Sequence, residues 1–279
     1  MIKMIKKILI HVVVIGILMI VLFPIFWMFL NSFKPMSEIF ASTPRIIRTV
    51  YTLENYRNIF SLMNFPRYLL NSVIFAFSTS SIVVIFAFLG AYAVVRYNFP
   101  GKSLYILFLL MLQMIPAVVL IVPLSEIVKY VHAYDTYQVV IILQMGFSTP
   151  ICTWLMIGYI KQGCPREIEE SAMIDGGTVL QILFKIVLPL TMPGVVSAYL
   201  FVFLLSWGDL LIPLTFLGSD FMQTVPLALA SVQGQGPGGS PPWDLLMAMS
   251  VLYSLPVVIM ASFLQKYITK GLLSGGVKF

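Results

Sequence analysis

Charged residues are scarce in this sequence. Asp, Glu, Lys and Arg make up 10% of its 279 residues, whereas 59% are hydrophobic. A soluble domain usually contains about 25% charged residues, because water contacts most of its surface. The composition therefore excludes a water-soluble fold and predicts an integral membrane protein. Helices are predicted rather than the strands of a barrel, because the apolar runs are long and lack sustained alternation.

Groups that could carry chemistry are also scarce. The chain has two histidines and two cysteines, and none has the spacing of metal ligands or of a disulfide framework. Gly101-Lys102-Ser103 is not a phosphate-binding loop, since Arg96 stands where its first glycine should be. The 17 basic and 11 acidic residues are not gathered on one polar segment, which argues against nucleic acid. We expect no bound metal, no catalysis and no ATP binding by this chain.

Six apolar runs are long enough to cross a bilayer, whose core of about 30 Å needs about 20 helical residues. They cover approximately residues 8–30, 68–95, 104–124, 138–160, 193–214 and 245–265. We predict one all-helical transmembrane domain over residues 1–279, with a polar loop at 161–190 and a tail at 266–279. The first run is too long for a signal peptide and no cleavage site follows it, so it is interpreted as a retained span. The basic residues favour both termini in the cytoplasm of a multi-pass inner-membrane protein.

Prolines interrupt the apolar runs. Each removes a backbone hydrogen bond and can kink its helix. They indicate either broken helices around a transport path or the ordinary tolerance of membrane helices for proline, and the sequence leaves both open. The five are Pro24, Pro116, Pro123, Pro150 and Pro256.

The polar loop 161–190 predicts two short helices. The first should begin near Pro165, because proline suits the first helical turn, and should end at Gly176-Gly177, because glycine accepts a left-handed cap. Thr178 and Gln181 have the spacing of a capping box that starts the second helix. A short helix outside the bilayer is marginal alone, so either a docking surface or an ordinary interfacial loop is indicated.

The same loop resembles the signature of ABC-importer permeases, which is Glu-Ala-Ala, two residues, Asp-Gly, nine residues and Ile-x-Leu-Pro. At this spacing the chain has Glu170-Ser171-Ala172, Asp175-Gly176 and Ile186-Val187-Leu188-Pro189. Ser171 replaces the usual first alanine, and Gly177 stands where alanine is common.

Other stretches resemble the carbohydrate branch of that family, in particular its smaller, six-span, maltose-transporter-like permease. The resemblance covers nearly the whole chain. These stretches are Thr52-Leu53-Glu54-Asn55-Tyr56, Asn71-Ser72, Ala91-Tyr92-Ala93 with Arg96, Phe99, Pro100 and Gly101, Trp207-Gly208-Asp209, and the tail from Gly271 to Lys278.

The resemblance implies an ABC type I importer transmembrane fold and a mechanism. The helix from Pro165 to Asp175 would be the coupling helix, seated in a cytoplasmic ATPase subunit that holds ATP and Mg. Two such ATPases, a second related permease, an extracytoplasmic solute-binding protein and a sugar would be the partners. The residues it implies for ATPase coupling are Glu169, Glu170, Ser171, Ala172, Asp175 and Gly176, with Gly275, Gly276 and Lys278 as a further contact in the tail.

A path for sugars needs hydrogen-bonding groups and aromatic faces rather than charges. Polar or aromatic residues inside the predicted spans meet this requirement, although such residues also join membrane helices to one another. The candidates are Gln113, Gln144, Ser148, Thr149, Ser206 and Trp207.

Three alternatives remain. An ABC permease for glycerol-3-phosphate or another polyol-type solute would keep the coupling loop, but a phosphate usually requires Arg or Lys. A stand-alone ion-coupled secondary transporter needs ionisable groups near the midplane, where only His11 lies well inside a predicted span. A membrane-bound enzyme is disfavoured by the lack of a nucleophile–base or metal cluster.

Overall fold

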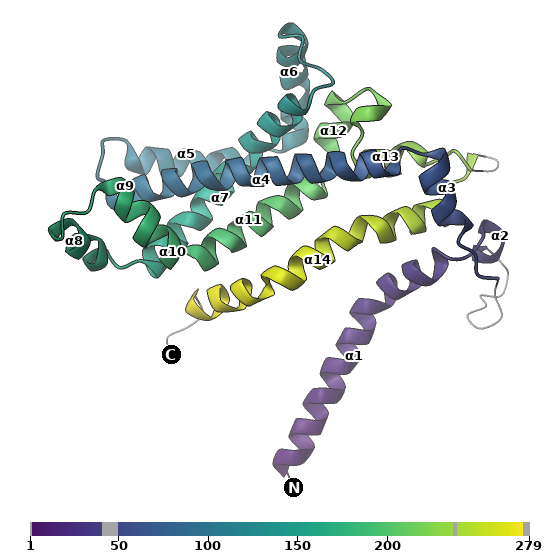
Figure 1. Cartoon of the computed structure of the whole chain (residues 1–279), viewed down its shortest axis with the longest axis horizontal. Helices are drawn as coiled ribbons and strands as arrows, with labels where there is room; N and C mark the ends of the chain where they lie inside the picture. The colour runs from purple at the N-terminus through teal and green to yellow at the C-terminus, as the bar shows by residue number, and fades with distance from the viewer. Residues whose placement is uncertain (1, 41–49, 237–238, 276–279) are drawn as a thin grey trace. The chain divides into compact units, whose positions relative to one another are not determined.

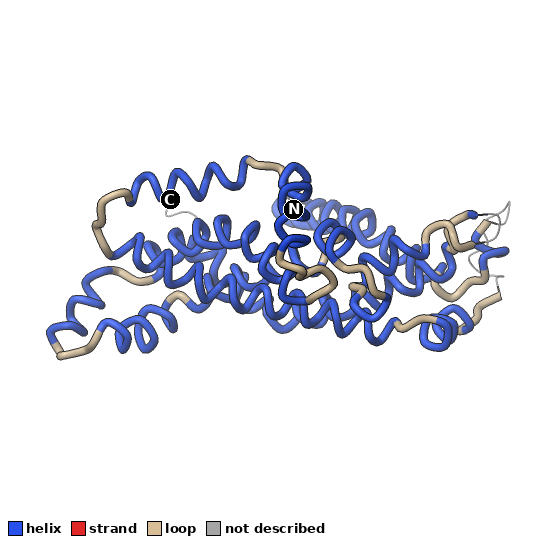
Figure 2. Tube along the Cα trace, turned by 90° about the horizontal axis from the view of Figure 1, so that it is seen from above, coloured by secondary structure: helices blue, strands red, loops and turns tan. Residues whose placement is uncertain are grey.

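The computed structural model describes residues 2–40, 50–236 and 239–275. These residues form helices and loops, and none of them is in a strand (Figure 2). The chain divides into two compact units, Met1–Pro66 with Ala228–Pro256 and Arg67–Leu227 with Val257–Phe279. The all-helical prediction is therefore confirmed for the described residues.

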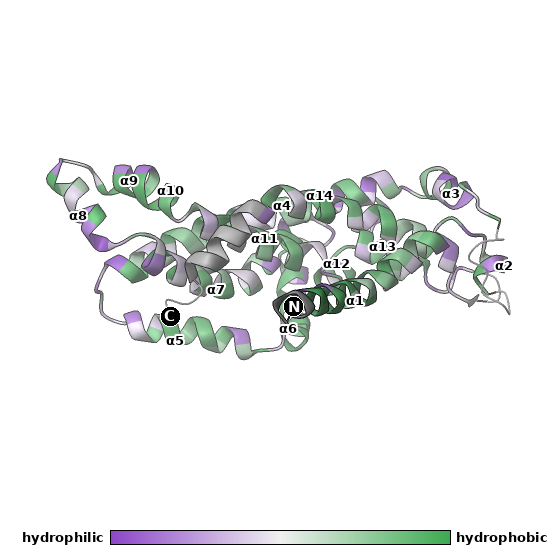
Figure 3. Ribbon diagram, turned by 90° about the horizontal axis from the view of Figure 1, so that it is seen from below, coloured by the Kyte–Doolittle hydropathy of each residue, from purple (hydrophilic) through white to green (hydrophobic). Residues whose placement is uncertain are grey.

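The first unit begins with α1 (Ile2–Asn31), followed by α2 (Met36–Ile39) and α3 (Glu54–Leu62). It also holds most of α13 (Val225–Val232) and the first part of α14 (Trp243–Gly275). Figure 3 shows α1 as apolar along most of its length, as expected of a helix surrounded by lipid. No residue of its apolar window is buried.

Asn55 of α3 joins that helix to the end of α1. Its side-chain amide donates to the carbonyl oxygens of Ser32 and Lys34, at 3.0 and 2.9 Å. The hydroxyl of Tyr56 is hydrogen-bonded to that of Ser32 at 2.7 Å. Thr52 accepts from the Glu54 amide as α3 begins. The Thr-Leu-Glu-Asn-Tyr stretch thus organises the segment after α1.

The second unit is built around α7, which packs against α5 and α11. Figure 1 shows α4 running along the same direction as α7 and α11, with α8 and α9 near its C-terminal end. The core of the second unit includes Val83 and Tyr92 of α4, Met156 and Ile160 of α7, and Val202 of α11. The helices are α4 (Phe65–Arg96), α5 (Lys102–Met114), α6 (Ala117–Tyr130), α7 (Tyr137–Gly163), α8 (Arg166–Ile174), α9 (Val179–Ile182), a π segment (Leu183–Val187), α10 (Leu188–Leu190), α11 (Met192–Trp207), α12 (Leu211–Phe216) and a 3-10 turn (Asp220–Met222).

Four helices of the described residues are each long and apolar enough to cross a membrane, and two bent pairs raise the number to six if each pair is one span. The four are Lys6–Asn31, Phe65–Arg96, Tyr137–Gly163 and Trp243–Gln265, and the pairs are Lys102–Met114 with Ala117–Tyr130 and Val179–Leu190 with Met192–Trp207. The predicted runs at 8–30, 68–95, 138–160 and 245–265 correspond to the four single helices.

The third and fifth predicted runs are not continuous helices. The run 104–124 is bent by 96° where α5 ends at Met114 and α6 begins after Pro116. Proline lacks the N–H that a continuing helix would need, so the helix breaks there. The run 193–214 ends at Trp207, because the Asp209 carboxylate accepts from the amides of Leu211 and Ile212 and starts a new helix, α12.

Proline distinguishes α4 from the other long helices. Pro24 lies inside α1, Pro150 inside α7 and Pro256 inside α14. The one proline of α4, Pro66, is its second residue and so lies in the first turn, where proline is tolerated. The helix therefore continues for 32 residues without a proline in its interior.

Candidate functional site

The loop after α7 folds as its residues indicate. Pro165 stands immediately before α8, and Gly176 takes a φ of +86° beyond its end. The amides of Gly176 and Gly177 donate to the carbonyls of Met173 and Ala172, at 3.0 and 2.9 Å, which closes the helix. Thr178 and Gln181 form the predicted capping box at the start of α9. The helix boundaries expected from the sequence are thus confirmed.

The two neighbouring glutamates of α8 lie in different environments. The Glu169 side chain is 3% exposed, whereas that of Glu170 is 57% exposed and pairs with Arg166 one turn earlier, at 2.9 Å. Three apolar side chains of the same helix are also exposed to solvent: Ile168, Met173 and Ile174. A helix that exposes both a carboxylate and several apolar side chains outside a long apolar span is suited to contact another protein.

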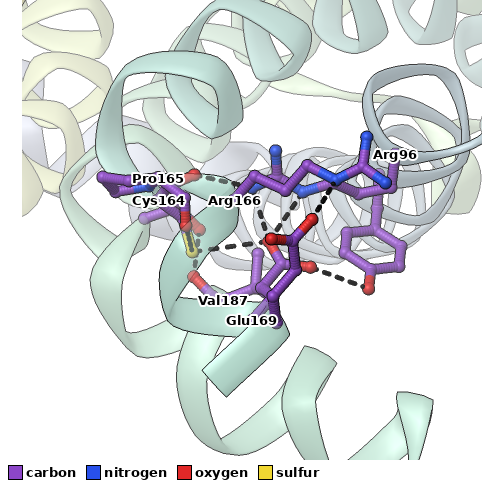
Figure 4. A network of polar contacts seen from close by, with 9 residues as sticks. Arg96, Cys164, Pro165, Arg166, Glu169 and Val187 are labelled. Atoms are coloured by element: carbon purple, nitrogen blue, oxygen red, sulfur yellow. Dashed lines mark hydrogen bonds and ion pairs between the residues drawn. The ribbon is translucent and has the colours of Figure 1, made fainter. Parts of the chain in front are cut away.

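Glu169 is the centre of a buried polar network (Figure 4). Arg96, the last residue of α4, contacts its Oε1 at 2.6 Å through Nε and at 2.5 Å through Nη2. Tyr92, one turn earlier on α4, donates its hydroxyl to Oε2 at 3.1 Å. Arg96 Nη2 also donates to the carbonyl oxygen of Cys164 at 2.6 Å. One carboxylate therefore joins α4, the end of α7 and α8.

The charges in this network are compensated. The Arg96 side chain is 10% exposed, so its guanidinium and the Glu169 carboxylate are both largely removed from water. Burial and the nearby Glu169 charge raise the pKa of the Cys164 thiol, whose Sγ lies 3.5 Å from Oε1. The thiol thus stays protonated and donates to the carboxylate.

The other residues expected to contact an ATPase lie around α8 or in the tail. Ser171 donates its hydroxyl to the Glu167 carbonyl, Ala172 packs against the core of the second unit, and Asp175 follows the last residue of α8. Gly275 is the last residue of α14, while Gly276 and Lys278 lie outside the described residues. The loop residues expected to contact an ATPase therefore lie on α8 or directly after it, but the Glu169 side chain points inward to Arg96 and is buried.

The candidate path residues do not form one group. Gln113 lines a cavity of about 440 Å³ with Trp154, Tyr159 and Ser197, and none of the other five candidates lines it. Gln144 and Ser148 are buried together on α7, with 3.5 Å between their polar atoms.

The remaining three path candidates lie apart from that cavity. Thr149 donates to the carbonyl of Met145 on its own helix, at 2.7 Å. Ser206 and Trp207 are buried at the end of α11, where the Trp207 ring stacks on Phe203. The Thr149 hydrogen bond lies within α7 and the Trp207 stacking within α11, and the structure does not gather the six into a single site.

A second polar network lies at the N-terminal end of α4. The Asn71 side-chain amide donates to the carbonyls of Phe221 and Gln223, both at 2.8 Å. Tyr137 at the start of α7 donates to the Asn71 side-chain oxygen. Ser72 accepts from the Val225 amide at 2.9 Å. The Asn71-Ser72 pair was part of the sequence resemblance, but its backbone partners at Phe221, Gln223 and Val225 lie 150 to 153 residues away and could not be deduced.

A loop next to this network is held by Asp135. Its Oδ1 accepts from the amides of Gly218 and Ser219, at 3.0 and 3.1 Å, and its own amide donates to the Phe216 carbonyl at 2.8 Å. Burial by itself raises the pKa of Asp135, but the hydrogen bonds from Ser219 and Gly218 outweigh burial and place that pKa below its ordinary value.

Comparisons with known proteins agree on one class. The family described as "Binding-protein-dependent transport system inner membrane component" matches residues 84–274. The trehalose/maltose transport system permease protein MalG of Thermococcus litoralis is 35% identical over 99% of the chain and 98% of its own length. The inner membrane ABC transporter permease protein YcjP of Escherichia coli is 36% identical over 94% of the chain and 92% of its length. A crystal structure of a bacterial ABC transporter that imports alginate matches with a TM-score of 0.77 at 20% identity, over 93% of the chain and 95% of its own.

Proposed function

The chain belongs to the family of binding-protein-dependent transport system inner membrane components, and we propose that it is a sugar permease subunit of an ATP-driven importer. As a permease component it is not itself an enzyme. Its part would be to form half of the translocation path and to move in response to ATPase subunits that hold ATP and Mg.

The observation that carries the proposal is the exposed face of α8. Glu170 is exposed at the position of the family motif, beside the exposed apolar side chains of Ile168, Met173 and Ile174. An acidic, partly apolar helix of this size gains stability from a cleft that supplies basic and apolar groups. We assign that cleft to a cytoplasmic ATPase subunit, with Glu170 paired to a basic group there.

The remaining partners follow from the same assignment. One chain forms half of a path, so a second, related permease would complete it. A soluble binding protein would deliver the solute on the side opposite α8. Sugar is the favoured cargo, because the T. litoralis relative is named for trehalose and maltose. The side chains around the Gln113 cavity include Trp154 and Ser197 but no Arg or Lys, which disfavours a phosphate-bearing solute there.

The test is to reconstitute the complete importer in vesicles, with both permeases, the ATPase and the binding protein, and to change single residues of α8. We expect Glu170→Ala and Asp175→Lys to release the ATPase or to uncouple ATP hydrolysis from uptake of radiolabelled trehalose and maltose, while membrane insertion is retained. Glu167→Ala is the matched control, because it removes an acid of the same helix outside the motif. Normal uptake by the first two variants with the ATPase attached would refute the coupling assignment.

A further inference from the structure

We propose that α4 transmits movement along its length, with the Arg96–Glu169 pair connecting it to α8 and the Asn71 network connecting it to the segment Asp220–Val225 at its other end. The proposal rests on the function above, because it needs an ATPase that moves α8. It assigns positioning roles to Arg96, Glu169 and Asn71, and none of them needs to touch an ATPase or a sugar.

The first argument is the way in which α8 is connected to the rest of the chain. Its backbone leads to α7 through the extended residues Cys164 and Pro165. In the other direction it leads through the Gly176-Gly177 turn and a π segment to a 77° bend before α11. Both backbone routes contain an irregular segment that can absorb a small movement. The side-chain contact between Glu169 of α8 and Arg96 of α4 includes no such irregular segment.

The second argument is the burial of the Arg96–Glu169 pair. Separating a buried pair leaves two uncompensated charges in a medium of low dielectric constant, which is strongly unfavourable. The exposed Arg166–Glu170 pair can separate at little cost, because water replaces each partner. The buried pair should therefore stay intact when α8 is moved, and Arg96 should follow.

The third argument is the continuity of α4. Its 32 residues would span about 48 Å at a rise of about 1.5 Å per residue, and its interior contains no proline. A continuous helix can carry a displacement from one end to the other because its backbone hydrogen bonds keep it rigid. The equally central helix α7 contains Pro150 in its interior, which removes one of its backbone hydrogen bonds.

The fourth argument concerns the N-terminal end of α4, where side-chain hydrogen bonds connect the helix to the segment Asp220–Val225. Asn71 and Ser72 hold three backbone groups between Phe221 and Val225. Tyr68 donates its hydroxyl to the Asp220 carboxylate. The Phe221 side chain is 65% exposed, so this segment presents a large apolar side chain beside the N-terminal end of α4. A displacement of α4 would move that surface.

The test uses the complete complex with its ATPase and partner permease, and spin labels at single introduced cysteines. Leu180→Cys places the label on α9, which lies in the loop at 161–190 and contacts α8, and Phe221→Cys places it beside the N-terminal end of α4. Both native side chains are exposed, while Cys152 and Cys164 are buried and stay in place. Spectra are compared without nucleotide and after trapping with ATP and vanadate.

We expect both labels to respond to ATP in the otherwise unchanged complex. In Arg96→Gln the Leu180 label should keep its response and the Phe221 label should lose it. Asn71→Ala, which leaves the buried ion pair intact, should have the same effect. Restoring the pair in reverse, with Arg96→Glu and Glu169→Arg together, should recover the response at Phe221. Lys102→Gln is the control, because Lys102 is a nearby basic residue that makes only exposed contacts.

A Phe221 label that responds fully in both Arg96→Gln and Asn71→Ala would overturn the inference. The absence of any ATP response at Leu180 in the otherwise unchanged complex would instead contradict the proposed coupling of α8. The two failures are therefore distinguishable.

Discussion

Two adjacent glutamates of α8 differ in what surrounds them and so in what they can do. Glu169 is enclosed by Arg96, Tyr92 and Cys164, whereas Glu170 meets water and Arg166. Removing one member of a buried pair leaves the other charge buried without a partner, whereas the partner of an exposed pair is solvated by water. The same change at the two positions should therefore act on different properties.

We predict that Glu169→Ala lowers the free energy of unfolding by roughly 3–5 kcal/mol, because it leaves the Arg96 charge buried without a partner. Glu170→Ala should cost less than about 1 kcal/mol, because its pair is exposed. Thermal unfolding of the detergent-purified chain measures both. Equal losses at the two positions would contradict the buried network.

At Asp135 the prediction concerns pH. Because the folded pKa lies below the ordinary value of 3.8, the carboxylate stabilises the fold at neutral pH. As the pH falls below about 4, the unfolded chain takes up the proton first, and the stabilisation is lost by the time the pH passes the folded pKa. Asp135→Asn should be less stable than the parent from pH 8 to 5, and the two should converge in acid. Unfolding midpoints measured across this range test it.

At the scale of elements, local signals predicted the helix boundaries of the loop at 161–190 and offered Pro116 as a possible break, but they did not predict the break after Trp207. Pro165, Gly176 and Thr178 act on residues within one turn, so their effect can be deduced from neighbours in the sequence. The break after Trp207 depends on Asp209, which was part of the sequence resemblance, but no local pattern assigns its carboxylate to the amides of α12. The Arg96–Glu169 pair joins residues 73 positions apart, and no repeating pattern in the sequence marks them as partners.

The end of α8 allows a sharp prediction. Gly176 has a left-handed φ of +86° with open space around it, so Gly176→Ala should cost about 1–2 kcal/mol from backbone strain alone. Ser171→Ala should instead add roughly 0.5 kcal/mol, since alanine is the better helix former. Limited proteolysis of the loop at 161–190 should become faster in the first variant and slower in the second. The reverse order would contradict the assigned cap.

At the scale of the whole molecule, the orientation in the membrane remains a prediction. The basic residues favour the cytoplasm for both termini and for the loop at 161–190. The site proposed for the ATPase requires the same orientation, because ATP is bound inside the cell. The apolar helices by themselves are compatible with either orientation.

We expect single cysteines to reveal the orientation. Tyr130→Cys, at the end of α6, should react with a membrane-impermeant thiol reagent in intact cells, and Lys161→Cys, near the end of α7, should react only after permeabilisation. Both native side chains are exposed, and the native cysteines are buried and should remain silent. The opposite labelling pattern would reverse the topology and exclude α8 from the cytoplasm.

The exposed Arg166–Glu170 pair has a consequence for assembly. Glu170 has a counter-ion on its own helix, so in the proposed assembly its charge would be partly compensated before an ATPase docks. In the proposed complex a basic group of the ATPase would displace Arg166, so one exposed ion pair would replace another. Because salt screens both pairs alike, raising the salt concentration should change the affinity of docking little.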